Sequence, residues 1–219
     1  VMHFDPLRER HGLAYDPFKS CTVPRPIGWL STVSQEGVHN LAPYSQWQNL
    51  SFDPPMVMFA ANRTPDGRRK DTVVNAETTG FFVWNMATFE LREAVNSSAQ
   101  AVAPEVDEFL EAGVTKAPCV EVPGARVAES PVHFECRYLS TQSLEGESPV
   151  GTVDVVFGRV VRIHIRDDVI GADGKLDILK IRPIARMGYY DYTVVDNIFE
   201  MRIPNASAAE LAGLEGRGD

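Results

Sequence analysis

The amino-acid sequence predicts a single all-β barrel domain that carries a few short helices. Short apolar runs recur along the chain and are separated by turn-forming residues, a pattern typical of closely spaced strands. Only a few segments place apolar residues at helical spacing. The chain has 219 residues, 44% of them hydrophobic, which is enough to bury one core. It contains no internal repeat and no low-complexity linker that would divide it.

The first elements form an arm and a hairpin. Residues 1–24 contain several prolines and little periodicity, so we expect an N-terminal arm packed on the body. The apolar runs 27–33 and 38–42 follow, joined by Ser34-Gln35-Glu36-Gly37. This connection has turn chemistry, because glycine takes a positive φ without strain. The three segments together predict a β-hairpin.

The middle of the chain alternates between buried strands and short helices. Residues 56–61 and 81–86 are apolar runs too short for surface helices, and they are predicted as buried strands. A short helix is expected over 72–79. A second is expected over 88–98, with Thr88 as its cap, and a third over 105–112, ended by a glycine.

The second half of the chain returns to strands. Residues 132–139 alternate in part, and 153–165 form a long run in which Gly158 marks a bulge or bend. Residues 175–195 are expected to form one further element.

We divide the chain accordingly into three parts. Residues 1–24 are the arm, 25–195 the barrel domain, and 196–219 a C-terminal extension with a short helix over 205–214 and a tail that frays.

Charge and cysteine content limit the classes of partner and compartment. The formal net charge of −9 argues against a general affinity for nucleic acid or an anionic membrane, since both require a basic face. No apolar run approaches the roughly 20 residues of a membrane span, and the N-terminus has no secretory signal pattern. The three cysteines are odd in number and widely spaced, which favours a reducing compartment. We therefore expect a cytoplasmic protein.

A basic segment follows the predicted strand 56–61. Residues 62–72 hold four of the 21 cations of the chain, and the segment leads into the helix expected over 72–79. Loop amides, a helix N-terminus, cationic side chains and a hydroxyl together make a phosphate site. The alternative is a solvated charged loop, which is the commoner state of such runs, and both interpretations stay open at this point.

A segment with mixed chemistry precedes the same strand. Residues 41–55 interleave amides, hydroxyls and aromatic rings, a combination that suits a flat heteroaromatic ligand. In the alternative interpretation, Tyr44 and Trp47 simply fill the core.

The remaining reactive residues indicate no other chemistry. His133 and Cys136 are three residues apart on a predicted strand, so they face opposite sides and make a poor metal pair. His133 and His164 each stand outside any recognisable motif, and lone histidines on strands are more often structural. The aromatic cluster Tyr189-Tyr190-Asp191-Tyr192 is expected to pack, although it could also cap a ligand or seal a dimer.

An ordered series of segments between residues 20 and 192 resembles the flavin reductase-like family. The chain is similar to its longer subgroup, described as flavoprotein oxygenases or nitrilotriacetate monooxygenase component B-like proteins. The matching segments are Arg25–Val33, Gly37, Asn40–Ser45, Asp53-Pro54-Pro55, Lys70-Asp71-Thr72, Gly80–Asn85, Asn96–Ala99, Glu135-Cys136, Phe157–Val160 and Pro183–Gly188.

The resemblance implies a six-stranded antiparallel Greek-key split barrel that binds FMN near the interface of a homodimer. Residues from Ser45 to Ser51 would line the isoalloxazine and ribityl chain, and Arg63, Lys70 and Thr72 would hold the phosphate, with Asp71 as a structural partner. The implied cofactor-binding residues are Ser45, Gln46, Trp47, Gln48, Asn49, Ser51, Ala61, Asn62, Arg63, Lys70, Asp71, Thr72, Asn96, Ser97 and Ser98.

The function implied by the resemblance is an FMN-dependent oxidoreductase. It would take hydride or electrons from a small-molecule donor such as NAD(P)H and pass them to a flavin, oxygen or a partner such as a monooxygenase. The Gly-Asp-Arg segment and the later histidine that short flavin reductases use for nicotinamide binding are missing here. An FMN electron carrier without enzymatic activity is therefore an alternative, and a non-redox barrel that binds another phosphate ligand is a more remote one. No catalytic side chain and no metal ligand is assigned.

Overall fold

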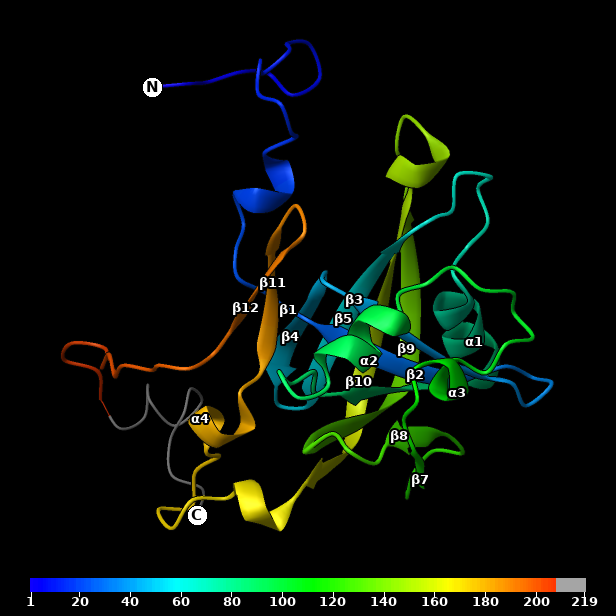
Figure 1. Cartoon of the computed structure of the whole chain (residues 1–219), viewed down its shortest axis with the longest axis vertical. Helices are drawn as coiled ribbons and strands as arrows, with labels where there is room; N and C mark the ends of the chain where they lie inside the picture. Colours follow the sequence, from blue (N-terminus) through cyan, green and yellow to red (C-terminus); the bar gives the residue numbers. More distant parts are fainter. Residues whose placement is uncertain (208–219) are drawn as a thin grey trace.

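The main body of the computed structural model is a seven-stranded antiparallel sheet that curls into a barrel (Figure 1). The structure describes residues 1–207. In spatial order the strands are β3 (His39–Tyr44), β2 (Gly28–Val33), β6 (Phe81–Asn85), β9 (Val132–Leu144), β10 (Val153–Ile165), β5 (Pro55–Asn62) and β4 (Trp47–Phe52).

The seam of this barrel lies between β3 and β4. These two strands are consecutive in the chain but stand at opposite ends of the sheet order, so the barrel is split between them. The expected β-rich split barrel is confirmed, with a main sheet of seven strands rather than six.

The predicted hairpin is present and pairs β2 with β3. Its turn is closed by Gly37, whose amide donates to the Ser34 carbonyl at 3.0 Å. Gly37 has a φ of 86°, a backbone conformation that favours glycine. The predicted buried strands are also confirmed as β5 and β6.

Strand β4 occupies part of the segment 41–55, for which we predicted a possible ligand contact but no strand. Trp47 points into the core, whereas Gln48 and Asn49 are exposed, and the ladder with β5 shifts register between Asn49 and Ser51. β4 stands at the edge of the sheet with one largely exposed face, which permits a polar sequence that hides a strand from pattern analysis.

Strand β10 bends where the sequence places Gly158. Its register with β9 shifts between Phe157 and Gly158 and again between Val160 and Arg162. A Cβ atom at Gly158 would lie 2.4 Å from Cζ of Phe82, so no larger residue fits against the core without displacement. The expected irregularity at this glycine is confirmed.

The three expected helices are present, the first starting one residue earlier than predicted and the other two shorter. They are α1 (Asp71–Thr79), α2 (Arg92–Ser97) and α3 (Glu108–Glu111). Helix α2 begins later than predicted because Thr88 forms an isolated bridge with Pro183 instead of a cap. The side chain of Asp107 caps α3 by accepting a hydrogen bond from the amide of Phe109.

The region 175–195 is three elements rather than one. Helix α4 (Ile178–Ile181) is followed by β11 (Ile184–Gly188) and β12 (Asp191–Val194), which form a small sheet with β1 (Arg25–Pro26). A residue with positive φ, Tyr189, turns the chain between β11 and β12. Of the helix expected over 205–214, residues 208–214 lie outside the described residues.

The smaller elements complete the described chain. A two-stranded hairpin of β7 (Lys116–Pro118) and β8 (Ala125–Val127) lies beside the main sheet. Three short 3₁₀ helices are η1 (Phe18–Ser20), η2 (Pro149–Gly151) and η3 (Asp167–Val169). No helix among the described residues is long and apolar enough to cross a membrane.

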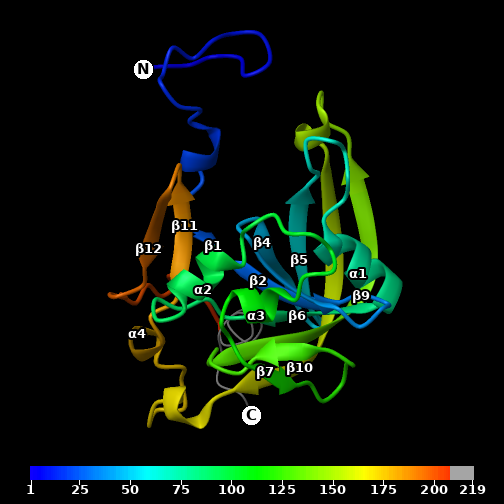
Figure 2. The same ribbon diagram turned by 45° about the vertical axis from the view of Figure 1, so that its right-hand side comes forward.

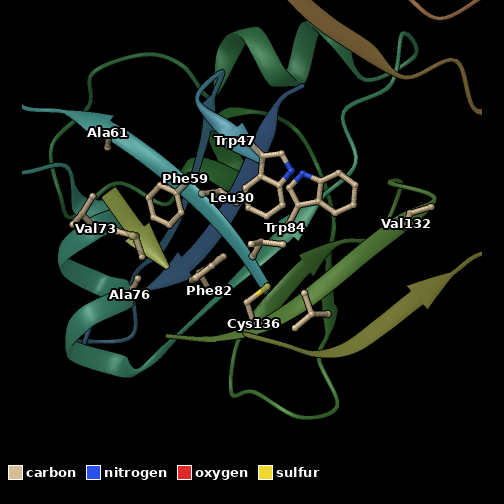
Figure 3. Close-up of a cluster of buried hydrophobic side chains, with 13 residues drawn as sticks. Leu30, Trp47, Phe59, Ala61, Val73, Ala76, Phe82, Trp84, Val132 and Cys136 are labelled. Atoms are coloured by element: carbon tan, nitrogen blue, oxygen red, sulfur yellow. The ribbon is translucent and has the colours of Figure 1, made fainter. Parts of the chain in front are cut away.

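The barrel core is built around aromatic side chains (Figure 3). Trp47 and Trp84 stack with ring centroids 5.6 Å apart and planes 4° from parallel. Phe59 and Phe82 meet edge to face at 5.3 Å, and Nε1 of Trp84 donates to the Ile27 carbonyl at 2.9 Å. Each such side chain stabilises the fold by roughly 1.5–3 kcal/mol through burial. Trp47 is therefore part of the barrel core.

Two parts of the chain project from the barrel (Figures 1 and 2). On one side the N-terminal arm continues beyond β11 and β12. On the other, the distal ends of β9 and β10 extend with η2. Within the described residues the arm meets the body near η1, and the ring of Tyr15 lies 5.5 Å from that of Tyr189. Tyr190 is 90% exposed. The packing of the arm and the domain boundaries stay predictions.

Candidate functional site

A polar cleft lies where the basic segment enters helix α1. It encloses about 130 Å³ and is bordered by β3, by the start of α1 and by the chain that follows α2. Its lining residues are Asn40, Ala42, Pro43, Tyr44, Thr64, Arg68, Arg69, Lys70, Asp71, Thr72, Ser98, Ala99, Gln100, Ala101, Val102 and Glu108.

Two cations of the basic segment hold a buried carboxylate. Arg63 lies 3.2 Å and Arg69 3.2 Å from the oxygens of Asp154, which is 1% exposed. Burial acts to raise the pKa of Asp154, but hydrogen bonds from Arg63, the Ser143 hydroxyl and Arg69 outweigh it and lower that pKa. Arg69 also makes a two-pronged ion pair with Glu77 at 2.6 and 2.7 Å. These guanidinium groups are engaged within the protein.

The other two cations of the segment, Arg68 and Lys70, are more available to a ligand. Arg68 makes only a surface pair with Asp66 at 3.5 Å among the described ion pairs. Lys70 has no ion pair within residues 1–207, and it precedes α1 in the N-cap position. The Lys70 side chain makes no capping hydrogen bond. The Lys70 carbonyl accepts from the amides of Val73 and Val74, and within residues 1–207 no side-chain oxygen accepts from the first-turn amides. An uncapped helix start beside a free lysine is suited to a phosphate group.

The floor of the cleft is a buried hydrogen-bond network. The Thr72 hydroxyl donates to Oδ1 of Asn40 at 2.7 Å and accepts from the Tyr44 hydroxyl at 2.9 Å. Thr72 is 1% exposed, so its hydroxyl is committed to this network. Burial raises the pKa of Tyr44, which therefore stays protonated and a donor.

A buried carboxyl group, Glu108, closes the network. One of its oxygens accepts hydrogen bonds from the Asn40 side-chain amide and from the Leu41 amide, the latter at 2.6 Å. Burial raises the pKa of Glu108 to about 7, and the nearby Asp71 adds to the rise against these hydrogen bonds. This carboxyl therefore changes charge near neutral pH.

Sequence reasoning missed Asn40, Tyr44 and Glu108 as wall residues of the cleft. Asn40 stood within a matching segment, and Tyr44 within the candidate ligand segment 41–55, but neither was among the implied cofactor-binding residues. Nothing in the local sequence distinguishes Glu108 from Glu105 or Glu111, because only the packing of α3 against β3 brings it to the cleft.

The expected ring-binding residues lie on a different surface. Ser45 and Gln46 are half-buried at the turn after β3, where Nε of Arg25 donates to the Ser45 hydroxyl at 3.4 Å. Gln48 and Asn49 are exposed on β4, and Ser51 is half-buried there. None of residues 45–51 lines the cleft.

Of the predicted residues outside segments 45–51 and 63–72, only Ser98 lines the cleft, and the other four lie elsewhere. Ser98 lines the cleft, is 2% exposed, and accepts a hydrogen bond from Nε1 of Trp29 at 2.9 Å. The Ser97 hydroxyl donates to the Glu111 carbonyl at 3.2 Å, and Asn96 is exposed on α2. Ala61 is part of the core, and the Asn62 side chain donates to the Val150 carbonyl at 2.8 Å.

Comparison with known proteins identifies the family of this chain. A family model described as a flavin reductase like domain matches residues 20–192. The chain belongs to this flavin reductase-like family. An uncharacterised relative from Aquifex aeolicus is 36% identical over 170 residues, covering 77% of this chain and 84% of the relative.

Solved structures agree with this family assignment. Nitrilotriacetate monooxygenase component B from Bacillus cereus has a TM-score of 0.84 and 27% identity, covering 92% of this chain and 98% of that one. The flavoredoxin of Desulfovibrio vulgaris (Miyazaki F) shares the fold, with a TM-score of 0.69 and 17% identity over 93% of this chain and 99% of that one. The resemblance inferred from the sequence segments is confirmed.

Proposed function

We propose that this flavin reductase-like protein binds FMN and acts as an oxidoreductase. The observation that carries the proposal is the cleft at the start of α1, where Lys70 has no ion pair within residues 1–207 and the helix has no side-chain cap. Riboflavin lacks the phosphate that such a site would hold, so the chemistry favours FMN within a flavin-binding family.

The residues present fit a phosphorylated flavin. Lys70, Arg68 and the first amides of α1 would hold the phosphate, while the exposed Gln100 borders the same cleft and offers hydrogen-bonding groups to a polyol chain. Residues 45–51 remain the proposed ring-binding segment. In this proposal Arg63 and Thr72 support the site through Asp154 and Asn40 rather than as direct phosphate ligands.

Bound FMN would supply a two-electron acceptor that can also pass single electrons. The chain's own contribution is to hold and orient the cofactor and to shield it from water. Tyr44 and Thr72 keep the floor of the cleft ordered, and Lys70 supplies positive charge at its rim.

We extend the proposal to a homodimer in which a second copy completes the ring site. The cleft of about 130 Å³ is smaller than the roughly 300–1,000 Å³ typical of ligand pockets, so it holds the phosphate end but not a three-ring system. The exposed tyrosines of β12 and the arm supply apolar surface for such contact.

The proposed donor is NAD(P)H, and the proposed acceptor is a free flavin, oxygen or a partner monooxygenase. The name of the Bacillus cereus neighbour, component B of a monooxygenase, supports the last of these. Three free cysteines at positions 21, 119 and 136 support a cytoplasmic location.

Anaerobic mixing tests the proposal. The protein is first titrated with FMN and with riboflavin, and the FMN-loaded form is then mixed with NADH or NADPH while flavin absorbance is followed. Tight FMN binding and rapid bleaching with one donor support the oxidoreductase. FMN binding without bleaching by either donor would favour the electron carrier. The fold shared with the Desulfovibrio flavoredoxin is consistent with either function. A protein that binds neither flavin contradicts the proposal.

A further inference from the structure

A second polar cleft lies at the other end of the long strands and shares no lining residue with the first. It encloses about 560 Å³ between the end of β10, the start of β9 and the segment that carries β8. Its lining is predominantly cationic, with Arg126, Arg162 and Arg166 in the walls together with His133 and His164, and it includes one carboxylate, that of Asp167. Such a concentration of positive charge is unusual in a chain of net charge −9.

The two histidines are cross-strand neighbours rather than isolated residues. His133 and His164 face each other in the β9–β10 register, with ring centroids 6.0 Å apart. Behind them Glu135 is fully buried, and its carboxylate accepts from the amides of Val120, Glu121 and Val122 at 2.7–3.0 Å.

Glu135 also fixes the ring of His164. Nε2 of His164 lies 2.5 Å from the Glu135 carboxylate, so this nitrogen is committed and Nδ1 is the one left for a ligand. A buried carboxylate held by three amides thus orients an imidazole at the wall of a cationic cleft.

The neighbouring ring, that of His133, is uncharged and has one unpaired nitrogen. Nε2 of His133 donates to the Val127 carbonyl at 2.7 Å, and burial lowers the pKa of His133 to about 4, so this ring is neutral. Its Nδ1 is buried and has no hydrogen-bond partner among the described residues. A buried acceptor without a donor is uncommon in native proteins, so this ring nitrogen is an unsatisfied group next to the cleft.

The arginines differ in how far they are neutralised. Arg162 pairs with Glu121, and Arg166 pairs with Asp168. Arg126 has no carboxylate partner in residues 1–207, and its Nε donates to the Pro118 carbonyl at 3.2 Å. Arg126 therefore presents an uncompensated guanidinium to a half-enclosed space, where an oxyanion would be bound with a charge-assisted hydrogen bond.

We propose that this second cleft binds the phosphate group of a small molecule. Arg126 from β8 contributes the principal charge, and Arg162 and His164 from β10 approach from the other wall. Donors from two walls suit a tetrahedral oxyanion with several acceptor oxygens better than a flat carboxylate. The inference concerns a site separate from the proposed FMN cleft and stands independently of it.

Titration calorimetry on the full chain saturated with FMN tests the proposal, since the first cleft is then filled. Inorganic phosphate is added at pH 7 against sodium chloride of matched ionic strength. We expect saturable binding to the wild type, at least about tenfold weaker binding to Arg126→Gln, and a smaller loss in His164→Gln. The imidazole NMR signals of His164 should shift on addition of phosphate.

Matched variants separate this site from other effects. Arg8→Gln removes one exposed arginine of the arm and should bind phosphate like the wild type. Lys175→Ala removes an exposed lysine that lines neither cleft and should also leave phosphate binding unchanged. Unchanged binding in Arg126→Gln, no saturable binding by the wild type, or equal binding of acetate would each overturn the proposal.

The outcome does not depend on the proposed function. A chain that takes up no FMN fails the first proposal, and phosphate titration of the flavin-free Lys70→Ala variant then tests the second cleft alone. Loss of phosphate binding in that variant would assign the phosphate to the first cleft instead.

Discussion

Two pairs of cations in one basic segment have different environments. Arg63 and Arg69 form ion pairs with the buried Asp154. Arg68 and Lys70 line the cleft beside α1 without an ion pair to a buried carboxylate among the described residues, and Arg69 borders the same cleft. The four side chains are equivalent in sequence, yet the first pair holds a buried carboxylate and the second is free to meet a ligand. Local composition therefore indicates charge, while the position of a partner carboxylate determines what each charge does.

The largest effect should come from the inward-facing pair. Arg69→Ala removes one ion-pair partner from Glu77 and one from Asp154, which is 1% exposed. We therefore expect the free energy of unfolding to fall by about 2–4 kcal/mol. Urea denaturation monitored by tryptophan fluorescence measures it. Arg68→Ala is the matched control, because its surface pair should change stability by less than about 0.5 kcal/mol. Equal stability of the two variants would contradict the division into pairs.

The next effect concerns Lys70 and ligand binding. Lys70→Ala should weaken FMN binding by about 1.5–3 kcal/mol, or roughly ten- to a hundredfold, while riboflavin binding changes little. Fluorescence titration of both flavins measures the difference. Lys175→Ala removes an exposed lysine and is the control. A similar loss for both flavins would show that Lys70 does not contact the phosphate.

A smaller effect should follow the charge of Glu108 in the same cleft. Its pKa is raised to about 7 in the folded protein, so the native state binds an extra proton between about pH 4.5 and 7. The stabilisation that comes from keeping Glu108 protonated in the folded state is fully present below that window, and it is lost as the pH rises through 7. Relative to Glu108→Gln, the wild type should therefore lose about 1–2 kcal/mol between pH 5 and pH 8.

Denaturation of both proteins at several pH values checks the Glu108 prediction. The glutamine retains an oxygen that accepts from Asn40 and Leu41, which preserves the local hydrogen bonds. Because all other titrating groups are shared, the difference between the two curves reports this carboxyl. A difference that does not vary with pH would mean that Glu108 titrates outside this range.

The smallest effect is expected at Arg68. Its guanidinium is exposed and shared with Asp66, so Arg68→Ala should weaken FMN binding by only a few-fold, about 0.5–1 kcal/mol. Raising the salt concentration should reduce this difference further, because exposed charges are screened. A loss of FMN affinity as large as that of Lys70→Ala would show that the two cations contribute equally to FMN binding.

Sequence reasoning succeeded where local chemistry decided the structure. The turn at Gly37 and the bend at Gly158 follow from backbone requirements that few other residues meet. The buried strands β5 and β6 follow from short apolar runs. Strand β4 was missed because an edge strand with an exposed face carries little apolar pattern, and the start of α2 was misplaced because Thr88 bridges to a residue distant in sequence.

The sequence by itself determined the β-rich class, the split barrel through its family resemblance, and a basic segment placed before a helix. Tertiary structure decided which cations are free, that Trp47 belongs to the core, and that Glu108 lines the same cleft as Lys70. It also joined His133, His164 and Arg126 at one cleft. The physical reason is that strand and turn preferences act over a few residues, whereas burial and charge pairing depend on residues that meet only after folding.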